Sequence, residues 1–88
     1  DPPASGSPMD QARACLRSSP DINAGNQCVV SVLRGRASTE SEVGLLCMVY
    51  RTMGRTSDAL RCMRHYIQRF PNGVRVRSFQ QYVDNNSP

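Results

Sequence analysis

The apolar residues of this chain recur at intervals of three and four positions, and breaker residues divide them into five segments. This spacing places apolar side chains on one face of an α-helix, and no segment alternates as a half-buried strand does. The five apolar sets are Met9-Ala12-Cys15-Leu16, Cys28-Val29-Val32-Leu33, Val43-Leu46-Cys47-Tyr50-Met53, Ala59-Cys62-Met63-Tyr66-Ile67-Phe70 and Val76-Phe79-Tyr82-Val83. We therefore expect an all-α fold of about five helices, arranged as stacked antiparallel hairpins.

Capping and breaker residues locate the ends of these helices. Pro8 suits the first turn of the first helix, and the segment 18–26, with Pro20, Asn23 and Gly25, predicts a break before the second. Thr39 and Glu42 have the spacing of a capping box at the start of the third helix. The second helix is expected to end near Gly35 and the third at Gly54. Thr56 or Ser57 is expected to cap the fourth helix, which residues 71–73 end, and the last helix is expected over residues 74–84.

The length of 88 residues favours a single small domain. Residues 1–8 are rich in Pro, Ser, Gly and Ala, which predicts a disordered linker, and residues 84–88 are expected to form a flexible tail. The packed domain is therefore expected over residues 9–83. The chain begins without Met, which indicates a removed leader or a piece of a longer protein. No apolar run approaches the roughly 20 residues of a spanning helix, so membrane insertion is not expected.

The four cysteines form two pairs that lie symmetrically about the predicted turns. The midpoint between Cys15 and Cys28 falls in the first break, and the midpoint between Cys47 and Cys62 falls in the second turn. Residues equidistant from a hairpin turn lie level with each other, so each pair could cross-link its own hairpin if the Cβ atoms come within about 4 Å. Two disulfides are the favoured interpretation, while one disulfide, or four free thiols acting as small apolar residues, are the alternatives. Disulfides would indicate the periplasm, the cell surface or secretion.

A metal site is a further alternative for the same sulfurs. Cys62 and His65 have the spacing of two zinc ligands, and Cys47 with Cys28 could complete a Cys₃His set. The other two cysteines lack this tight spacing, so no metal or other cofactor is expected. The pairing also differs from twin-cysteine helical hairpins, in which both cysteines of a pair occupy one helix.

Residues 40–73 resemble the tetratricopeptide repeat (TPR). That repeat has a Leu, a small residue, a large aromatic, a turn Gly, an Ala, two bulky positions and a closing Pro. The matching residues are Leu46, Cys47, Tyr50, Gly54, Ala59, Met63, Tyr66 and Pro71. Met63 and Tyr66 depart from the usual residue types, and Val43 occupies a position where Trp is common. Residues 9–37 form only a degenerate hairpin, and the last helix is expected to act as a C-terminal cap.

The resemblance implies a short α-solenoid that binds a protein or peptide on its concave face. This partner could be another domain of the parent chain. Transferred position by position, the groove residues are Ser41, Gly44, Met48, Arg51 and Thr52. Relatives that hold a C-terminal carboxylate use Lys and Asn at the positions of Gly44 and Met48, so that clamp is not expected here.

No catalytic signature is present in the sequence. There is no Lys nucleophile, no Cys-x-x-Cys pair, and the single His65 lies among arginines on the expected solvent side of its helix. We therefore expect a non-catalytic interaction or scaffold domain of a larger extracytoplasmic protein; the Arg-only basic residues indicate a bacterial origin.

Two other functions remain open. One is an Arg-rich domain that binds nucleic acid or an acidic surface, for which dispersed arginines must converge on one face. Those arginines are Arg51, Arg55, Arg61, Arg64, Arg75 and Arg77. Their helical phases do not favour convergence, so nucleic acid is not the expected partner. The other is a purely structural cap or spacer.

Overall fold

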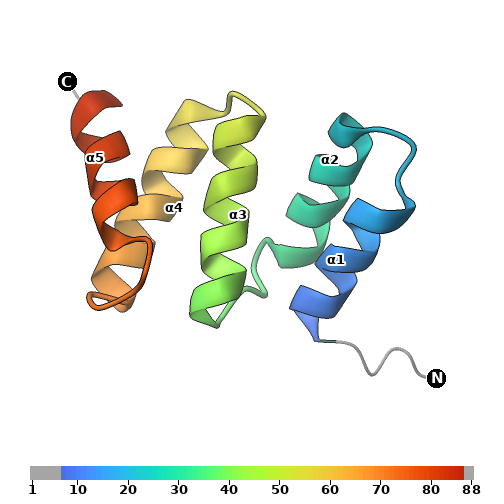
Figure 1. The fold of residues 1–88 in the computed structure, drawn as a ribbon, viewed down its shortest axis with the longest axis horizontal. Helices are drawn as coiled ribbons and strands as arrows, with labels where there is room; N and C mark the ends of the chain where they lie inside the picture. The colour runs from blue at the N-terminus through green and yellow to red at the C-terminus, as the bar shows by residue number, and fades with distance from the viewer. Residues whose placement is uncertain (1–6, 87–88) are drawn as a thin grey trace.

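The computed structural model describes residues 7–86, which form five helices in succession along the long axis of the molecule (Figure 1). The helices are α1 (Pro8–Ser18), α2 (Ile22–Leu33), α3 (Glu40–Thr52), α4 (Thr56–Arg69) and α5 (Val76–Asn86). No strand occurs within this part of the chain, so the all-α class is confirmed. Residues 1–6 of the predicted linker lie outside the described residues. None of the helices in 7–86 is long and apolar enough to cross a membrane.

Side-chain caps fix the first turns of α1, α2 and α3. In α1 the Ser7 hydroxyl accepts a hydrogen bond from the Asp10 backbone N–H at 3.2 Å, and the Asp10 carboxylate accepts from the Ser7 N–H. In α2 the Asp21 side chain accepts a single hydrogen bond from the Ala24 N–H. The predicted capping box of α3 is confirmed, because Thr39 and Glu42 exchange side chain–backbone hydrogen bonds at 3.2 and 3.3 Å. These caps satisfy N–H groups that a helix start leaves without partners.

The break predicted over residues 18–26 is present but shorter than expected, because α1 ends at Ser18 and α2 already begins at Ile22 and contains Gly25. A Cβ atom at this position would lie 3.5 Å from Leu16 and 3.6 Å from Ser19, so the glycine allows α1 and α2 to approach closely. It therefore serves packing between helices, and Asp21 alone starts the helix.

The cap predicted at Thr56 or Ser57 was wrong. Arg55 occupies the N-cap position of α4, and no side chain caps that helix. The backbone N–H of Arg55 instead donates to Tyr50 O at 3.0 Å, and Gly54 N–H donates to Arg51 O at 3.0 Å. Gly54 has φ +76°, so these bonds form a Schellman motif that ends α3 and leads directly into α4. The last helix also begins and ends two residues later than predicted.

The helices pack as two hairpins and one additional helix. α1 packs on α2, α3 packs on α4, α5 packs on α4, and α2 joins the two hairpins by contacting α3. In Figure 1, α3 and α5 lie in front of α4. One continuous core runs through all five helices, with Val29, Leu33, Cys47, Met63, Tyr66 and Phe79 among its largest fully buried side chains.

Both predicted disulfides are present. Cys15 pairs with Cys28 and Cys47 pairs with Cys62, with Cα–Cα distances of 5.6 and 5.3 Å. Each bridge therefore joins the two helices of one hairpin. The pairing occupies the three sulfurs that the zinc alternative required, so that alternative does not hold. Disulfides of this kind are typical of proteins in oxidising compartments.

Candidate functional site

A hollow of about 360 Å³ lies between α1 and α3, and we call it the α1/α3 groove. Its main lining residues are Met9, Arg13, Leu16, Ser41, Leu45 and Arg75. Leu16 is 43% exposed although it belongs to the apolar set of its helix. The groove thus combines apolar side chains from two helices with basic side chains from α1 and from the segment before α5.

The five groove residues predicted on α3 do not form one surface. Ser41 is exposed and lines the α1/α3 groove, whereas Gly44 is buried. Arg75 covers Gly44, since a Cβ at Gly44 would lie 3.0 Å from the Arg75 Cδ and 3.1 Å from its Nε. A partner would therefore have to displace Arg75 to reach the backbone at Gly44.

The other predicted residues lie further along α3, toward α5. Met48 is half-buried against the core, and the Thr52 hydroxyl donates to the Met48 carbonyl at 3.0 Å. The Arg51 guanidinium lies over the Tyr82 ring, 5.2 Å from its centroid. Together Arg51 and Tyr82 line a second, smaller hollow of about 280 Å³ between α3 and α5. Of the predicted set, Ser41 and Arg51 thus line different hollows, and Gly44 is covered. Met48 and Thr52 line neither of the two hollows.

A hydrogen-bond network around Tyr66 holds the segment that carries Arg75. The buried Tyr66 hydroxyl donates to the Glu40 carboxylate at 2.7 Å, and the Val74 N–H donates to the same oxygen at 2.9 Å. The Arg75 N–H donates to the Tyr66 oxygen at 3.2 Å. A Cβ at Gly73 would overlap the Tyr66 hydroxyl, so only glycine fits there. The network fixes the backbone of Arg75 beside the N-terminal turn of α3.

The same network changes the acidity of both side chains. The hydrogen bond from Tyr66, followed by the one from the Val74 N–H, lowers the pKa of Glu40. Burial, followed by the hydrogen bond to Glu40, raises the pKa of Tyr66. Tyr66 is therefore the proton donor and Glu40 the charged acceptor at neutral pH.

Glu42 fixes the other side of the groove. Its buried carboxylate accepts hydrogen bonds from the backbone N–H groups of Ser38 at 3.1 Å, Thr39 at 3.3 Å and Met9 at 3.2 Å. The bond from Ser38 is the largest of the effects that lower the pKa of Glu42. Because Met9 lies in the first turn of α1, this single carboxylate joins the start of α1 to the start of α3.

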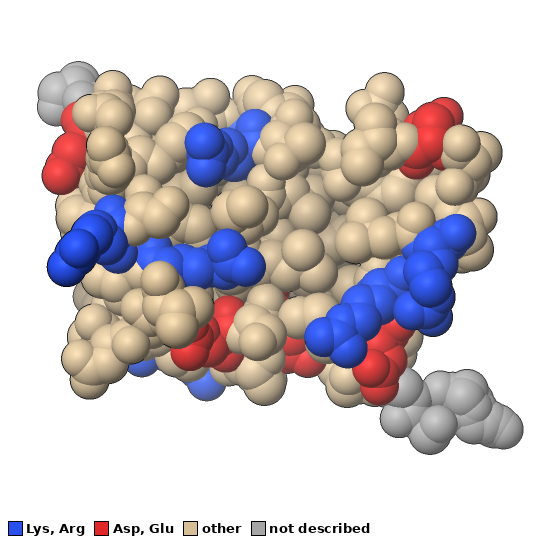
Figure 2. All heavy atoms as spheres, viewed as in Figure 1, with Lys and Arg blue, Asp and Glu red and all other residues tan. Residues whose placement is uncertain are grey.

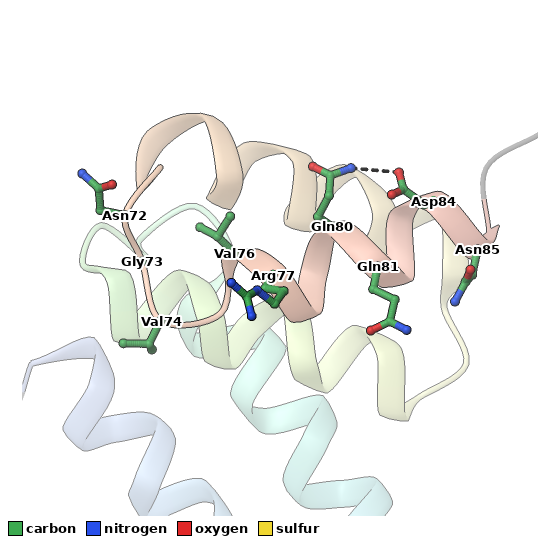
Figure 3. Close-up of a pocket in the computed structure, with 9 residues that line it drawn as sticks. All are labelled: Asn72, Gly73, Val74, Val76, Arg77, Gln80, Gln81, Asp84 and Asn85. Atoms are coloured by element: carbon green, nitrogen blue, oxygen red, sulfur yellow. Dashed lines mark hydrogen bonds between the residues drawn. The ribbon is translucent and has the colours of Figure 1, made fainter.

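A larger hollow, about 960 Å³, lies on the outer flank of α5 and does not gather a chemical site. Figure 3 shows its lining residues spread along α5 and the loop before it, with Asn72 on the loop and Asn85 near the other end of the helix. Gln80 donates to Asp84 at 2.9 Å, so these two polar groups satisfy each other. The residues there form a mostly polar outer surface along α5.

His65 and Asp58, both on α4, are not among the residues that line the α1/α3 groove. His65 is exposed on α4. Asp58 is held by Arg55 at 2.7 Å and by Arg61 at 2.9 Å in surface ion pairs. Within residues 7–86, no group of three or more His, Cys, Asp or Glu side chains could hold a metal ion.

Sequence reasoning missed Arg13, Leu16, Leu45 and Arg75 as groove residues. They belong to α1, to α3 and to the segment before α5, and they meet only because the two hairpins dock. The single signal available in the sequence was Leu16, which extends the apolar face of the first helix beyond Cys15.

No protein-family model, no curated protein and no solved structure matches this chain. Its function must therefore be inferred from its own residues.

Proposed function

We propose that this chain is a non-catalytic protein-interaction domain with a TPR-like architecture, and that it binds a partner polypeptide on the side where α1 and α3 meet. The observation that carries the proposal is the α1/α3 groove, in which apolar side chains from two helices lie beside exposed arginines. Such a mixture of apolar area and a few directed polar groups is typical of binding sites.

The packing of the second hairpin supports the TPR-like interpretation. Cys47 and Ala59 are fully buried small residues, and the bulkier Met63 and Tyr66 are fully buried beside them. Small residues allow two helices to cross closely while large ones fill the space around the crossing. Gly54, in the left-handed conformation, lies at the turn that the repeat spacing requires.

The disulfides support a location outside the cytoplasm, namely the periplasm, the cell surface or the extracellular medium. We place the domain in a larger bacterial protein as a scaffold or interaction element. The absence of Lys among eleven basic residues is the compositional basis for the bacterial origin.

The nucleic-acid alternative has less support than peptide binding. Arg55 and Arg61 are paired with Asp58, and Arg51 lies over the ring of Tyr82. On the face shown in Figure 2 the basic side chains lie in separate groups, with uncharged surface and acidic side chains between and below them. A nucleic-acid site instead needs a continuous basic patch or stripe.

A random peptide library displayed on phage and selected on the oxidised domain tests the proposal. We expect selected peptides to shift the amide resonances of α1, of α3 near Ser41 and of residues 73–75 when titrated into isotope-labelled domain. The Ser41→Trp variant, which fills the groove, should lose binding, and His65→Ala on α4 should retain it. Peptides that instead shift residues around Arg61 and His65 would show that the wrong face was chosen.

A further inference from the structure

We propose that the α1/α3 groove recognises a partner segment in which a bulky apolar residue is followed by an aspartate or glutamate within the chain. The apolar side chain packs between Leu16 and Leu45, and the carboxylate is held by Arg13 and Arg75. This inference rests on the proposed function and specifies the chemistry of the partner.

The apolar part of the site comes from two helices that face each other. Leu16 on α1 is one of the few large apolar side chains that are strongly exposed, and Leu45 on α3 is only partly covered by the core. Met9 contributes a flexible thioether to the same hollow. A hollow of about 360 Å³ accommodates one large side chain and a short stretch of backbone.

The charged part of the site selects one carboxylate. Neither Arg13 nor Arg75 forms an ion pair with an acidic side chain among the described residues, although Arg75 acts on Glu40 electrostatically. The carboxylate of Glu40 also lines the groove, but it already accepts hydrogen bonds from Tyr66 and Val74. Two arginines and one glutamate leave a single net positive charge, which one acidic residue neutralises. A guanidinium group holds a carboxylate through two parallel hydrogen bonds.

The position of Arg75 depends on the glycine beneath it. The Arg75 side chain lies across Gly44 at a distance that leaves no room for a Cβ atom without a shift. The Tyr66 network holds the backbone of Arg75 at the same time. Gly44 therefore acts as a positioning residue for the arginine, and its role is distinct from that of a residue that contacts the partner.

The probes are three peptides, acetylated and amidated at their ends, that differ only at a central pair of residues: Leu-Asp, Leu-Asn or Gly-Asp. Each is titrated into isotope-labelled, oxidised domain. We expect Leu-Asp to shift resonances of α1, α3 and residues 73–75, and Leu-Asn and Gly-Asp to bind about tenfold more weakly, because each lacks one of the two recognised groups. Equal binding of Leu-Asp and Leu-Asn, or no shift with Leu-Asp at millimolar concentration, would overturn the inference.

Charge variants separate recognition from general attraction. Arg13→Gln and Arg75→Gln should each weaken Leu-Asp binding about tenfold. Arg17→Gln is the matched control, because Arg17 is an exposed arginine of the same helix that does not line the groove. It should leave the affinity almost unchanged. An equal loss with Arg17→Gln and Arg13→Gln would indicate nonspecific attraction and contradict the proposal.

The Gly44→Ala variant tests whether Gly44 positions the Arg75 side chain, and it changes no charge. The added methyl group makes the Arg75 side chain shift by a few tenths of an ångström, so Leu-Asp binding should fall only slightly, while alanine inside a helix leaves the melting temperature unchanged or raised. A loss as large as that of Arg75→Gln would contradict this account of Gly44. Selected library peptides that bind the groove without an acidic residue would overturn this inference and leave the proposed function intact. Peptides that bind α4 would overturn both.

Discussion

The α3–α4 hairpin buries residues along most of α3, whereas α1 contributes only Ala12 and Cys15 to the buried core. α3 packs against helices on both sides, while α1 packs against α2 and touches α3 only at its edge. Yet both hairpins carry a disulfide of nearly the same span, 13 residues in one and 15 in the other. Because α1 contributes few buried residues and packs mainly on α2, we expect α1 to depend on its disulfide more than α3 does.

The turns of the two hairpins differ as well. Gly54 closes the α3–α4 turn with backbone hydrogen bonds alone. The α1–α2 turn contains no glycine, and the Ser19 hydroxyl donates to the Cys15 carbonyl while Asp21 caps the next helix. The α1–α2 turn therefore depends on side-chain hydrogen bonds, whereas the α3–α4 turn does not.

The largest expected effect comes from removing one bridge at a time. Cys15→Ala with Cys28→Ala, and Cys47→Ala with Cys62→Ala, should each cost about 3 kcal/mol of unfolding free energy, because the closed loops are similar in length. Hydrogen exchange distinguishes them. The first variant should lose amide protection in α1 and α2 while α3 and α4 stay protected. A uniform loss over all helices would show that the two hairpins do not differ in their dependence on the bridge.

Overpacking of the two buried alanines should have the next largest effect. Ala12 and Ala59 are both fully buried, so Ala12→Leu and Ala59→Leu should each cost about 1–3 kcal/mol. The cost should be larger at Ala59, because α4 is held between α3 and α5, whereas the terminal α1 can shift outward. Thermal unfolding measures the difference. Arg61→Ala serves as the control, since this exposed side chain forms only a surface ion pair and should change stability little.

Glu42 tests the junction between the hairpins. Glu42→Gln should cost roughly 1–3 kcal/mol at neutral pH, because the carboxylate serves three backbone donors. Folding lowers the pKa of Glu42 below its ordinary value of 4.5. The associated stability is therefore present above that value and is lost as the pH falls through the lower, folded pKa.

Urea unfolding between neutral pH and pH 3 provides the measurement. Glu40, whose pKa is also lowered, contributes to the same acid dependence. Glu42→Gln should therefore flatten the acid loss of stability without removing it. A variant with the full acid dependence of the parent protein would show that the Glu42 carboxylate does not carry the junction.

The smallest of these effects is expected at the two left-handed glycines. Gly35 has φ +79° and Gly54 has φ +76°, and no atom lies within 4 Å of a Cβ at either position. Substitution by alanine should therefore cost only the backbone term, about 1 kcal/mol at each site. A similar fall in melting temperature for both variants would support this; a much larger one at Gly54 would indicate that the α3–α4 turn is strained in other ways.

Local sequence information predicted the parts of the fold that local geometry determines. Apolar spacing identified all five helices, and symmetry about the turns identified both cysteine pairs. It failed where the role of a residue depends on a neighbour that is distant in the sequence. Glycine often breaks a helix, but Gly25 lies inside α2 and allows α1 to approach closely. The start of α4 has no side-chain cap, because the Schellman hydrogen bonds of Gly54 and Arg55 already fix the chain there.

The candidate site was harder to predict than the fold for the same reason. Ser41, predicted as a groove residue, is exposed on α3, but Gly44 is covered by Arg75, which lies far away in the sequence. The partners of Ser41 in the groove, Arg13 and Leu16, are brought near it by the docking of one hairpin on the other. No periodicity within one helix contains this information.

The order of the cysteines has a consequence for how the protein matures. Four cysteines allow three pairings, and this fold uses the one in which each cysteine joins the next cysteine along the chain. It has the shortest loops, so it has the lowest entropic cost of closure. A chain that enters an oxidising compartment from its N-terminus can complete the first bridge before Cys47 arrives. We therefore expect oxidative refolding to pass through native one-bridge species, and trapped intermediates with Cys28–Cys47 linkages as the main species would contradict this.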